Sequence, residues 1–171
     1  NKDHVEDLKR CITSIQKNST WSNYEIIVVE NNSTTPEIKD YYSQLLGLSG
    51  DDSYEERCKL HTVCGHDSGI LHSGDGRISI VTYHGDFNYS AVNDLGASYA
   101  SGEYILLLNN DTEVITANWM EEMLMYAQRE DVGAVGAKLY YADKTIQHAG
   151  VVIGLGAHRT AGHTHYRIPV Q

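Results

Sequence analysis

The sequence predicts an α/β fold built on a largely parallel sheet. Three short runs, at residues 25–29, 78–82 and 104–108, have the aliphatic or β-branched composition of buried strands. Segments with apolar residues at helical spacing lie between and around these runs. Alternating strands and helices are typical of units that place parallel strands side by side, so a Rossmann-like sheet with flanking helices is expected.

An amphipathic helix is expected near the start of the chain. Asp3 and Glu6 have the spacing of a capping box, although Asp replaces the usual Ser or Thr. The apolar residues of this helix recur at intervals of three and four, as on one helix face: Val5, Leu8, Ile12 and Ile15.

A strand and a second helix come next in the sequence. The strand, residues 25–29, leads into a polar turn at residues 30–36. Pro36 favours the first turn of the second helix, because its missing N–H has no partner to lose there. Gly47 is expected to end that helix, because glycine readily adopts the left-handed conformation of a helix end.

Residues 49–76 interrupt this alternation and are expected to form an excursion or long loop. They are rich in Gly, Ser, Asp and His and have no clear periodicity, and long loops of this kind are often functional or mobile. The segment also contains residue types that bind zinc, but their spacing matches no common zinc module, which favours an exposed loop. These residues are Cys58, His61, Cys64 and His66, with His72 nearby.

The second half of the chain resumes the alternation. A strand at residues 78–82 is followed by a helix at about residues 89–101, which Gly102 would end, and by the strand at residues 104–108. Thr116 is expected to cap a further helix. That helix would turn Trp119, Met120, Met123, Leu124 and Ala127 inward, and further strands are expected at residues 132–140 and 146–153. No domain boundary is evident, so residues 1–171 are expected to form one unit.

Composition excludes several functional classes. The 171 residues carry a formal net charge of −10, which disfavours nucleic acid as a partner and a polybasic membrane anchor. No apolar run approaches the roughly 20 residues of a transmembrane segment. Three cysteines leave at least one thiol unpaired, which favours a cytoplasmic location.

The strand at residues 104–108 stops abruptly at Asn109, Asn110 and Asp111. In open α/β sheets, ligands bind beyond the carboxyl ends of the strands. A carboxylate at that position can hold a divalent cation such as Mg²⁺ against the phosphates of a substrate. The alternative is that Asp111 only stabilises a turn at the strand end.

Six segments together carry a resemblance to a known family: residues 24–33, 87–96, 101–113, 119–123, 132–138 and 145–150. They resemble the family-two inverting glycosyltransferases of the GT-A fold, most of all bacterial rhamnosyltransferase-like members that build surface polysaccharides. The resemblance covers most of the chain outside residues 49–76. Members of the family begin with a further strand and continue into an acceptor-binding half. We therefore expect a GT-A fold that is incomplete at both ends, with the catalytic general base outside this chain.

The resemblance also implies roles for individual residues. Asp111 would be the metal ligand, for Mg²⁺ or Mn²⁺, and Asn110 would contact the ribose. Glu30, with Asn31 and Asn32, would contact the base or ribose of the donor nucleotide. Asn88 and Asn93 would line the nucleotide and diphosphate pocket.

Gly96 and Glu113 have other expected roles. Gly96 is expected to permit close packing of a helix on the sheet rather than to touch a ligand. Glu113 would either support the metal site or be a surface acid.

Four histidines lie late in the sequence: His148, His158, His163 and His165. They would line a pocket, bind a metal or act as a base. The alternative is that they lie in a solvent-facing loop.

The expected function is transfer of a sugar, with inversion, from a UDP- or dTDP-sugar to a saccharide or lipid-linked saccharide acceptor. This would take place in the cytoplasm, at the inner face of the membrane. One alternative is a sugar nucleotidyltransferase, which would need a Gly-rich basic phosphate loop that is not visible here. The other alternative is a non-catalytic nucleotide-sugar binding module.

Overall fold

The computed structural model describes residues 1–63, 69–155 and 160–169 of the chain. It divides into two compact units, Asn1–Asn118 and Trp119–Gln171. The sequence did not predict this division, because no Pro-, Gly- or Ser-rich linker marks residues 116–119.

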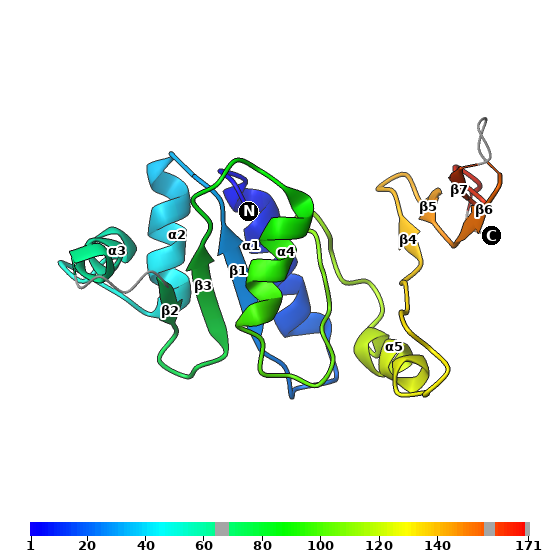
Figure 1. Cartoon of the computed structure of the whole chain (residues 1–171), viewed down its shortest axis with the longest axis horizontal. Helices are drawn as coiled ribbons and strands as arrows, with labels where there is room; N and C mark the ends of the chain where they lie inside the picture. The colour runs from blue at the N-terminus through cyan, green and yellow to red at the C-terminus, as the bar shows by residue number, and fades with distance from the viewer. Residues whose placement is uncertain (64–68, 156–159, 170–171) are drawn as a thin grey trace. The chain divides into compact units, whose positions relative to one another are not determined.

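The first unit is built on a three-stranded sheet with the order β1-β3-β2 (Figure 1). β1 (Ile26–Glu30) and β3 (Ile78–Thr82) are parallel and pair in register from Ile26 with Ile78 to Glu30 with Thr82. β2 (Ile70–His72) runs antiparallel on the other side of β3. The α/β class and the strands expected at residues 25–29 and 78–82 are therefore confirmed.

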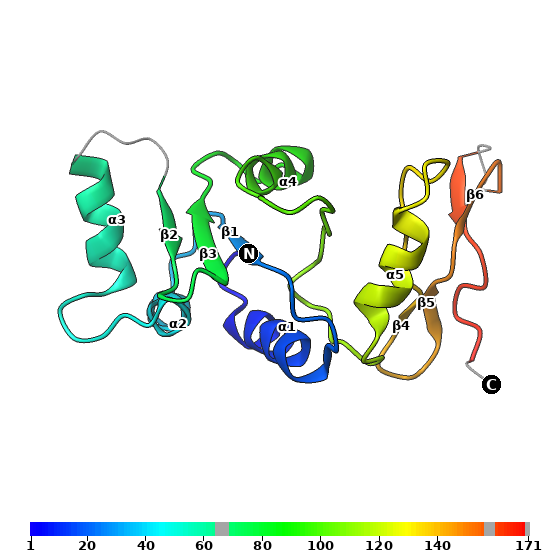
Figure 2. The same ribbon diagram turned by 90° about the horizontal axis from the view of Figure 1, so that it is seen from below.

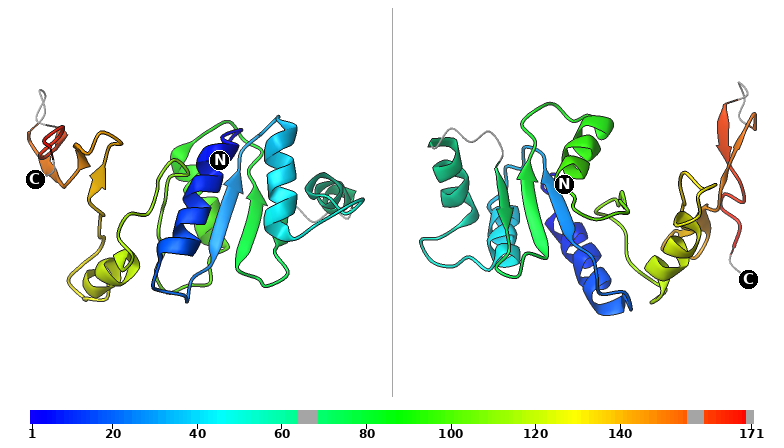
Figure 3. Two further views of the ribbon diagram at one scale, coloured as in Figure 1. Left: turned by 180° about the vertical axis from the view of Figure 1, so that it is seen from behind. Right: turned by 60° about the horizontal axis from the view of Figure 1, so that its bottom comes forward.

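Helices cover both faces of this sheet. α1 (Val5–Asn18) and α2 (Pro36–Leu46) lie on one face, and α4 (Tyr89–Ser98) lies on the other (Figures 2 and 3). The predicted apolar face of α1 is confirmed, because Leu8, Ile12 and Ile15 are buried. The core between α1, α2 and the sheet includes Leu8, Ile12, Val28, Ile38, Tyr42 and Ile80.

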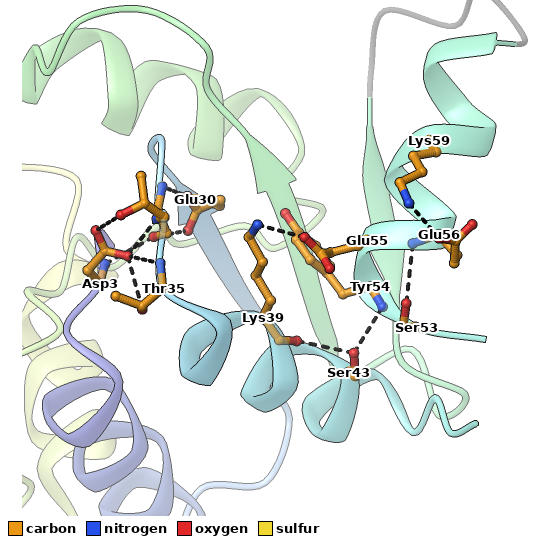
Figure 4. Close-up of polar contacts among 12 residues, drawn as sticks. Asp3, Glu30, Thr35, Lys39, Ser43, Ser53, Tyr54, Glu55, Glu56 and Lys59 are labelled. Carbon is orange, nitrogen blue, oxygen red and sulfur yellow. Dashed lines mark hydrogen bonds and ion pairs between the residues drawn. The ribbon is translucent and has the colours of Figure 1, made fainter. Parts of the chain in front are cut away.

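The predicted capping box at Asp3 is wrong. α1 begins at Val5 after His4, and no side chain caps it. Asp3 instead adopts a positive φ of 54° and turns its carboxylate to the start of α2. There it accepts hydrogen bonds from the main-chain nitrogens of Thr34 (2.7 Å) and Thr35 (2.9 Å) (Figure 4). A capping box depends on neighbouring residues, whereas the partners of Asp3 lie about thirty residues away.

The predicted boundaries of α2 are confirmed. Pro36 is its first residue, and Gly47 follows it with a left-handed φ of 72°. The main-chain nitrogen of Gly47 donates to the carbonyl of Gln44, which closes the last turn.

Residues 49–76 are not only a loop, which corrects the expectation from the sequence. They contain α3 (Tyr54–Val63) and β2. Among its described side chains, α3 packs on the core through Tyr54, whose ring lies 4.9 Å from that of Tyr42, and through Cys58. Polar contacts with α2 complete the attachment: Lys39 pairs with Glu55, and the main-chain nitrogen of Tyr54 donates to Ser43 (Figure 4).

Residues 104–108 are not a buried strand in the structure. They have no sheet pairing, and their side chains are between 40% and 55% exposed. A buried strand needs a neighbour on each side, and β3 is the one strand that pairs with β1 among the described residues. Composition alone could not supply the missing neighbour. The segment begins close to Glu25, whose carboxylate accepts from the nitrogen and hydroxyl of Ser101 (both 2.7 Å).

Among its described residues, the second unit contains one helix and two antiparallel β-hairpins. α5 (Trp119–Ala127) is followed by β4 (Leu139–Tyr140) paired with β5 (Ile146–His148), and by β6 (Val151–Ile153) paired with β7 (Ala161–His163). These strands are shorter than expected. Thr116 does not cap α5, which begins at Trp119, although the five residues expected on its inward face are all half-buried. No helix among the described residues is long and apolar enough to cross a membrane.

Candidate functional site

Asn1 joins the two groups of residues that the sequence singled out for donor binding. Its main-chain nitrogen donates to the carbonyl of Val29 (2.6 Å), and its carbonyl accepts from the nitrogen of Asn31 (2.9 Å). Its side-chain oxygen accepts from the amide of Asn110 (2.8 Å). The turn at Asn110 and Asp111 therefore lies beside the carboxyl end of β1, at the edge where α/β proteins bind ligands.

Asp111 is exposed within this turn. The side-chain hydrogen bond in the turn runs from the hydroxyl of Thr112 to the carbonyl of Asn109 (2.8 Å), so it does not engage the carboxylate of Asp111. Within the described ranges, the carboxylate of Asp111 takes part in no hydrogen bond or ion pair. The thiol of Cys11 on α1 lies 3.6 Å from the Thr112 hydroxyl, and burial raises its pKa. The turn is thus attached to α1 while its acid faces solvent.

A metal ion at Asp111 would need further ligands from elsewhere. No three His, Cys, Asp or Glu side chains come close enough to hold a metal ion in the part of the chain that the structure describes. A single carboxylate fits a hard cation that keeps several waters and takes its other ligands from substrate phosphates. The chemistry of this turn is therefore suited to a metal that arrives together with a diphosphate.

Glu30 is buried at the end of β1, with 4% of its surface exposed. One carboxylate oxygen accepts from the main-chain nitrogen of Ser33. The other accepts from the Ser33 hydroxyl (2.7 Å) and from the Tyr42 hydroxyl (2.5 Å). Both oxygens are therefore engaged inside the protein, and a direct contact between Glu30 and a donor would require these bonds to rearrange.

Tyr42 extends this arrangement towards the turn. Its hydroxyl accepts from the side-chain amide of Asn1 (3.0 Å) while donating to Glu30. Burial and the neighbouring carboxylate raise the pKa of Tyr42 well above its ordinary range, so the hydroxyl stays protonated. An unbroken series of hydrogen bonds thus runs from Asn110 through Asn1 and Tyr42 to Glu30.

Asn31 and Asn32 hold the loop that follows β3. The buried amide of Asn31 donates to the carbonyls of Tyr83 (3.2 Å) and Gly85 (3.0 Å). The amide of Asn32, which is exposed, donates to the same carbonyl of Gly85 (3.0 Å). These bonds fix the spacing between the carboxyl ends of β1 and β3, and Asn32 is the member of the pair that solvent reaches.

α4 begins at the same edge of the sheet (Figure 1). Asn88 caps it, because its side-chain oxygen accepts from the nitrogen of Ala91 (3.1 Å). Asn93 donates to the carbonyl of Tyr89 one turn earlier (2.8 Å). The positive end of the helix dipole at Asn88 favours an anion at this edge.

Gly96 sets how closely α4 approaches β1. A Cβ atom added there would lie 2.9 Å from Cγ2 of Val29, which is closer than Cβ atoms approach other atoms in proteins. The expected role of Gly96 in close helix–sheet packing is therefore confirmed.

The remaining candidates lie elsewhere or outside the described residues. Cys58 is half-buried on α3, and His72 is hydrogen-bonded to Ser79 (2.8 Å). Glu113 is exposed beside α1 and lines a shallow hollow there, as a surface acid would. Cys64, His66 and His158, and the side chain of His61, lie outside the described residues, so the zinc alternative stays a prediction.

Sequence reasoning missed the residues that connect this edge, above all Asn1, Ser33 and Tyr42. One signal was available: a tyrosine on the inward face of α2 needs a partner for its hydroxyl, and polar residues at a neighbouring strand end can supply one. The partner itself could not be identified, because it lies on another element.

The sequence model of "Glycosyl transferase family 2" matches residues 1–60 and 68–164. "Uncharacterized protein y4gI" of Sinorhizobium fredii is 37% identical over 168 residues, which cover 98% of this chain and 15% of that protein. "O-antigen biosynthesis protein RfbC" of Myxococcus xanthus is 34% identical over 168 residues, which cover 98% of this chain and 11% of that protein. The chain thus spans a small part of these relatives, and no solved structure matches it significantly.

Proposed function

Because the chain belongs to glycosyl transferase family 2, we propose that it binds the nucleotide-sugar donor of a glycosyltransferase that builds a surface polysaccharide. The similarity to a protein named for O-antigen biosynthesis supports the polysaccharide product. As both relatives are far longer than this chain, sugar transfer is proposed for the whole protein to which this donor-binding portion contributes.

The hydrogen bond between Asn110 and Asn1 is the observation that carries this proposal. It connects the turn of Asp111 to the end of β1 and so joins two groups of polar residues into one edge. The start of α4 adds a positive dipole end at the same edge. A nucleoside diphosphate has the matching chemistry, with an anionic diphosphate next to a hydroxyl-rich ribose.

In the proposed site, Asp111 would hold Mg²⁺ or Mn²⁺ against the diphosphate, and such an ion would supply positive charge next to the leaving nucleoside diphosphate. Asn110 and Asn32 offer side-chain groups to the ribose and the base of a UDP- or dTDP-sugar. Asn31, Asn88 and Glu30 maintain the spacing of the edge.

Transfer would proceed with inversion onto a hydroxyl of a saccharide or lipid-linked saccharide. A general base outside this chain would remove the proton of that hydroxyl. A lipid-linked acceptor would be held in the membrane, so we propose that transfer takes place at its inner face.

Calorimetric titration of UDP and dTDP, with and without Mn²⁺, tests the proposal. We expect binding that requires the metal and that weakens at least about tenfold in Asp111→Asn, because one carboxylate supplies the protein's share of the ligands. Glu113→Gln removes an exposed acid two residues away and is the matched control. Metal-dependent binding that is unchanged in Asp111→Asn would refute the role of Asp111, and no binding by the parent protein would refute the donor site.

A further inference from the structure

Two histidines face each other in the second unit. Nδ1 of His148 lies 3.1 Å from Nδ1 of His163, and their ring planes meet at 83°. His148 is the last residue of β5 and His163 the last residue of β7. The pair therefore connects the β4–β5 hairpin to the β6–β7 hairpin.

The main chain holds both positions independently of the imidazoles. The nitrogen of Thr164 donates to the carbonyl of Gly150 (3.0 Å), and its hydroxyl donates to the carbonyl of Ala149 (3.1 Å). Further along, the nitrogen of Arg167 donates to the carbonyl of Ile146 (2.9 Å). These bonds flank each histidine and hold the backbone positions from which the two imidazoles extend.

The separation of the two nitrogens matches that of two ligands on one metal ion. With zinc–nitrogen bonds of about 2.0–2.1 Å, two imidazole nitrogens stand about 3.3 Å apart at the tetrahedral angle and about 2.9 Å apart at a right angle. The observed 3.1 Å lies between these values. We propose that His148 and His163 bind a divalent first-row transition metal through their Nδ1 atoms.

A hollow borders one of the two histidines. His148 lines a hollow of about 410 Å³ together with Gly136, Lys138 and Gly150. None of the described His, Cys, Asp or Glu side chains completes a group of three with the pair. Water or a ligand oxygen would therefore fill the remaining positions of an ion bound by the pair.

This site differs in ligand chemistry from the turn of Asp111. Imidazole nitrogens select Zn²⁺, Cu²⁺ or Ni²⁺, whereas a carboxylate with waters and phosphates selects Mg²⁺ or Mn²⁺. The histidine site also needs no nucleotide, so it can be tested independently of the proposed donor site.

Titration of the protein with Zn²⁺ alone tests this assignment, by calorimetry and by ¹⁵N NMR of the histidine rings. We expect one bound ion, with both Nδ1 signals shifted. Each of His148→Ala and His163→Ala should weaken binding at least about tenfold, the loss that even outer partners of metal ligands cause.

Two controls keep the outcome clear. His165→Asn removes a nearby exposed histidine while tolerating the positive φ of 57° at that position, and it should leave Zn²⁺ affinity unchanged. Circular dichroism and His148→Gln, which retains a polar side chain, separate lost binding from lost folding. Zn²⁺ binding that persists in both alanine variants, or its absence in the parent protein, would overturn the proposal and leave the pair as two hydrogen-bonded imidazoles.

Discussion

The side-chain amide of Asn110 donates a 2.8 Å hydrogen bond to the side-chain oxygen of Asn1, across more than a hundred residues of sequence. Asn1 is in turn bonded to Tyr42, and Tyr42 to Glu30. The position of the turn that carries Asp111 therefore depends on residues that need not touch a ligand.

Tyr42→Phe should lower the free energy of unfolding by about 1–3 kcal/mol, because it leaves the buried carboxylate of Glu30 without one of its donors. Urea unfolding followed by circular dichroism measures the change. Tyr41→Phe is the control, since among the described residues the Tyr41 hydroxyl has no hydrogen-bond partner. Equal losses in the two variants would show that the bond to Glu30 contributes nothing specific.

Gly96→Ala should lower the free energy of unfolding by about 1–3 kcal/mol, because the added methyl group meets Cγ2 of Val29 and forces α4 away from β1. Gly74→Ala adds the same group where no atom lies within 4 Å, and is expected to change stability little. Thermal unfolding of both variants checks the difference. An unchanged Tm in Gly96→Ala would mean that the helix shifts without cost.

Alkaline pH should destabilise the first unit. Burial raises the pKa of Tyr41 to about 12 and raises those of Tyr42 and Tyr54 further. These groups stay protonated in the folded state while they ionise in the unfolded chain above about pH 10. The stabilisation from these three tyrosines is fully present below about pH 10. It is lost as the pH rises through their raised pKa values in the folded state.

Urea unfolding at about pH 8 and at about pH 11 measures this effect. The loss between the two should shrink in Tyr54→Phe, which removes one of the three titrating groups. The same loss in parent and variant would contradict the attribution to buried tyrosines.

Acid should weaken the start of α2. Hydrogen bonds from Thr35 and Thr34 lower the pKa of Asp3 below its ordinary value. The stabilisation from Asp3 is therefore present above the unfolded value, about 3.9, and is lost as the pH falls through the lowered folded value. Asp3→Asn should lower Tm at neutral pH and flatten its fall below about pH 4. A parallel fall in parent and variant would argue against this role.

Local sequence signals predicted the elements that depend on neighbours in the chain. β1 and β3 followed from β-branched composition, and the ends of α2 followed from Pro36 and Gly47. Gly96 followed from its place on a helix next to the sheet. Each of these features has its physical cause within a few residues, or in packing that any such helix requires.

Features that depend on distant partners could not be predicted in the same way. Asp3 looked like the cap of its own helix, but its partners Thr34 and Thr35 lie on another element. Glu30 looked available to a ligand, but the hydroxyl of Tyr42 reaches it from α2. The positions of Asp111 and Glu30 at one edge were anticipated, whereas the bonds that hold them there were not.

The exposed run at residues 104–108 has a practical consequence for handling the protein. Five consecutive large side chains face solvent beside a sheet whose edge strand β1 pairs on one side only, among the described residues. Exposed edges of this kind recruit further strands, so concentrated samples should self-associate and scatter light. Leu107→Lys places a charge within this apolar run and should raise the protein concentration at which turbidity begins. The fold should stay the same, because the side chain of Leu107 is exposed.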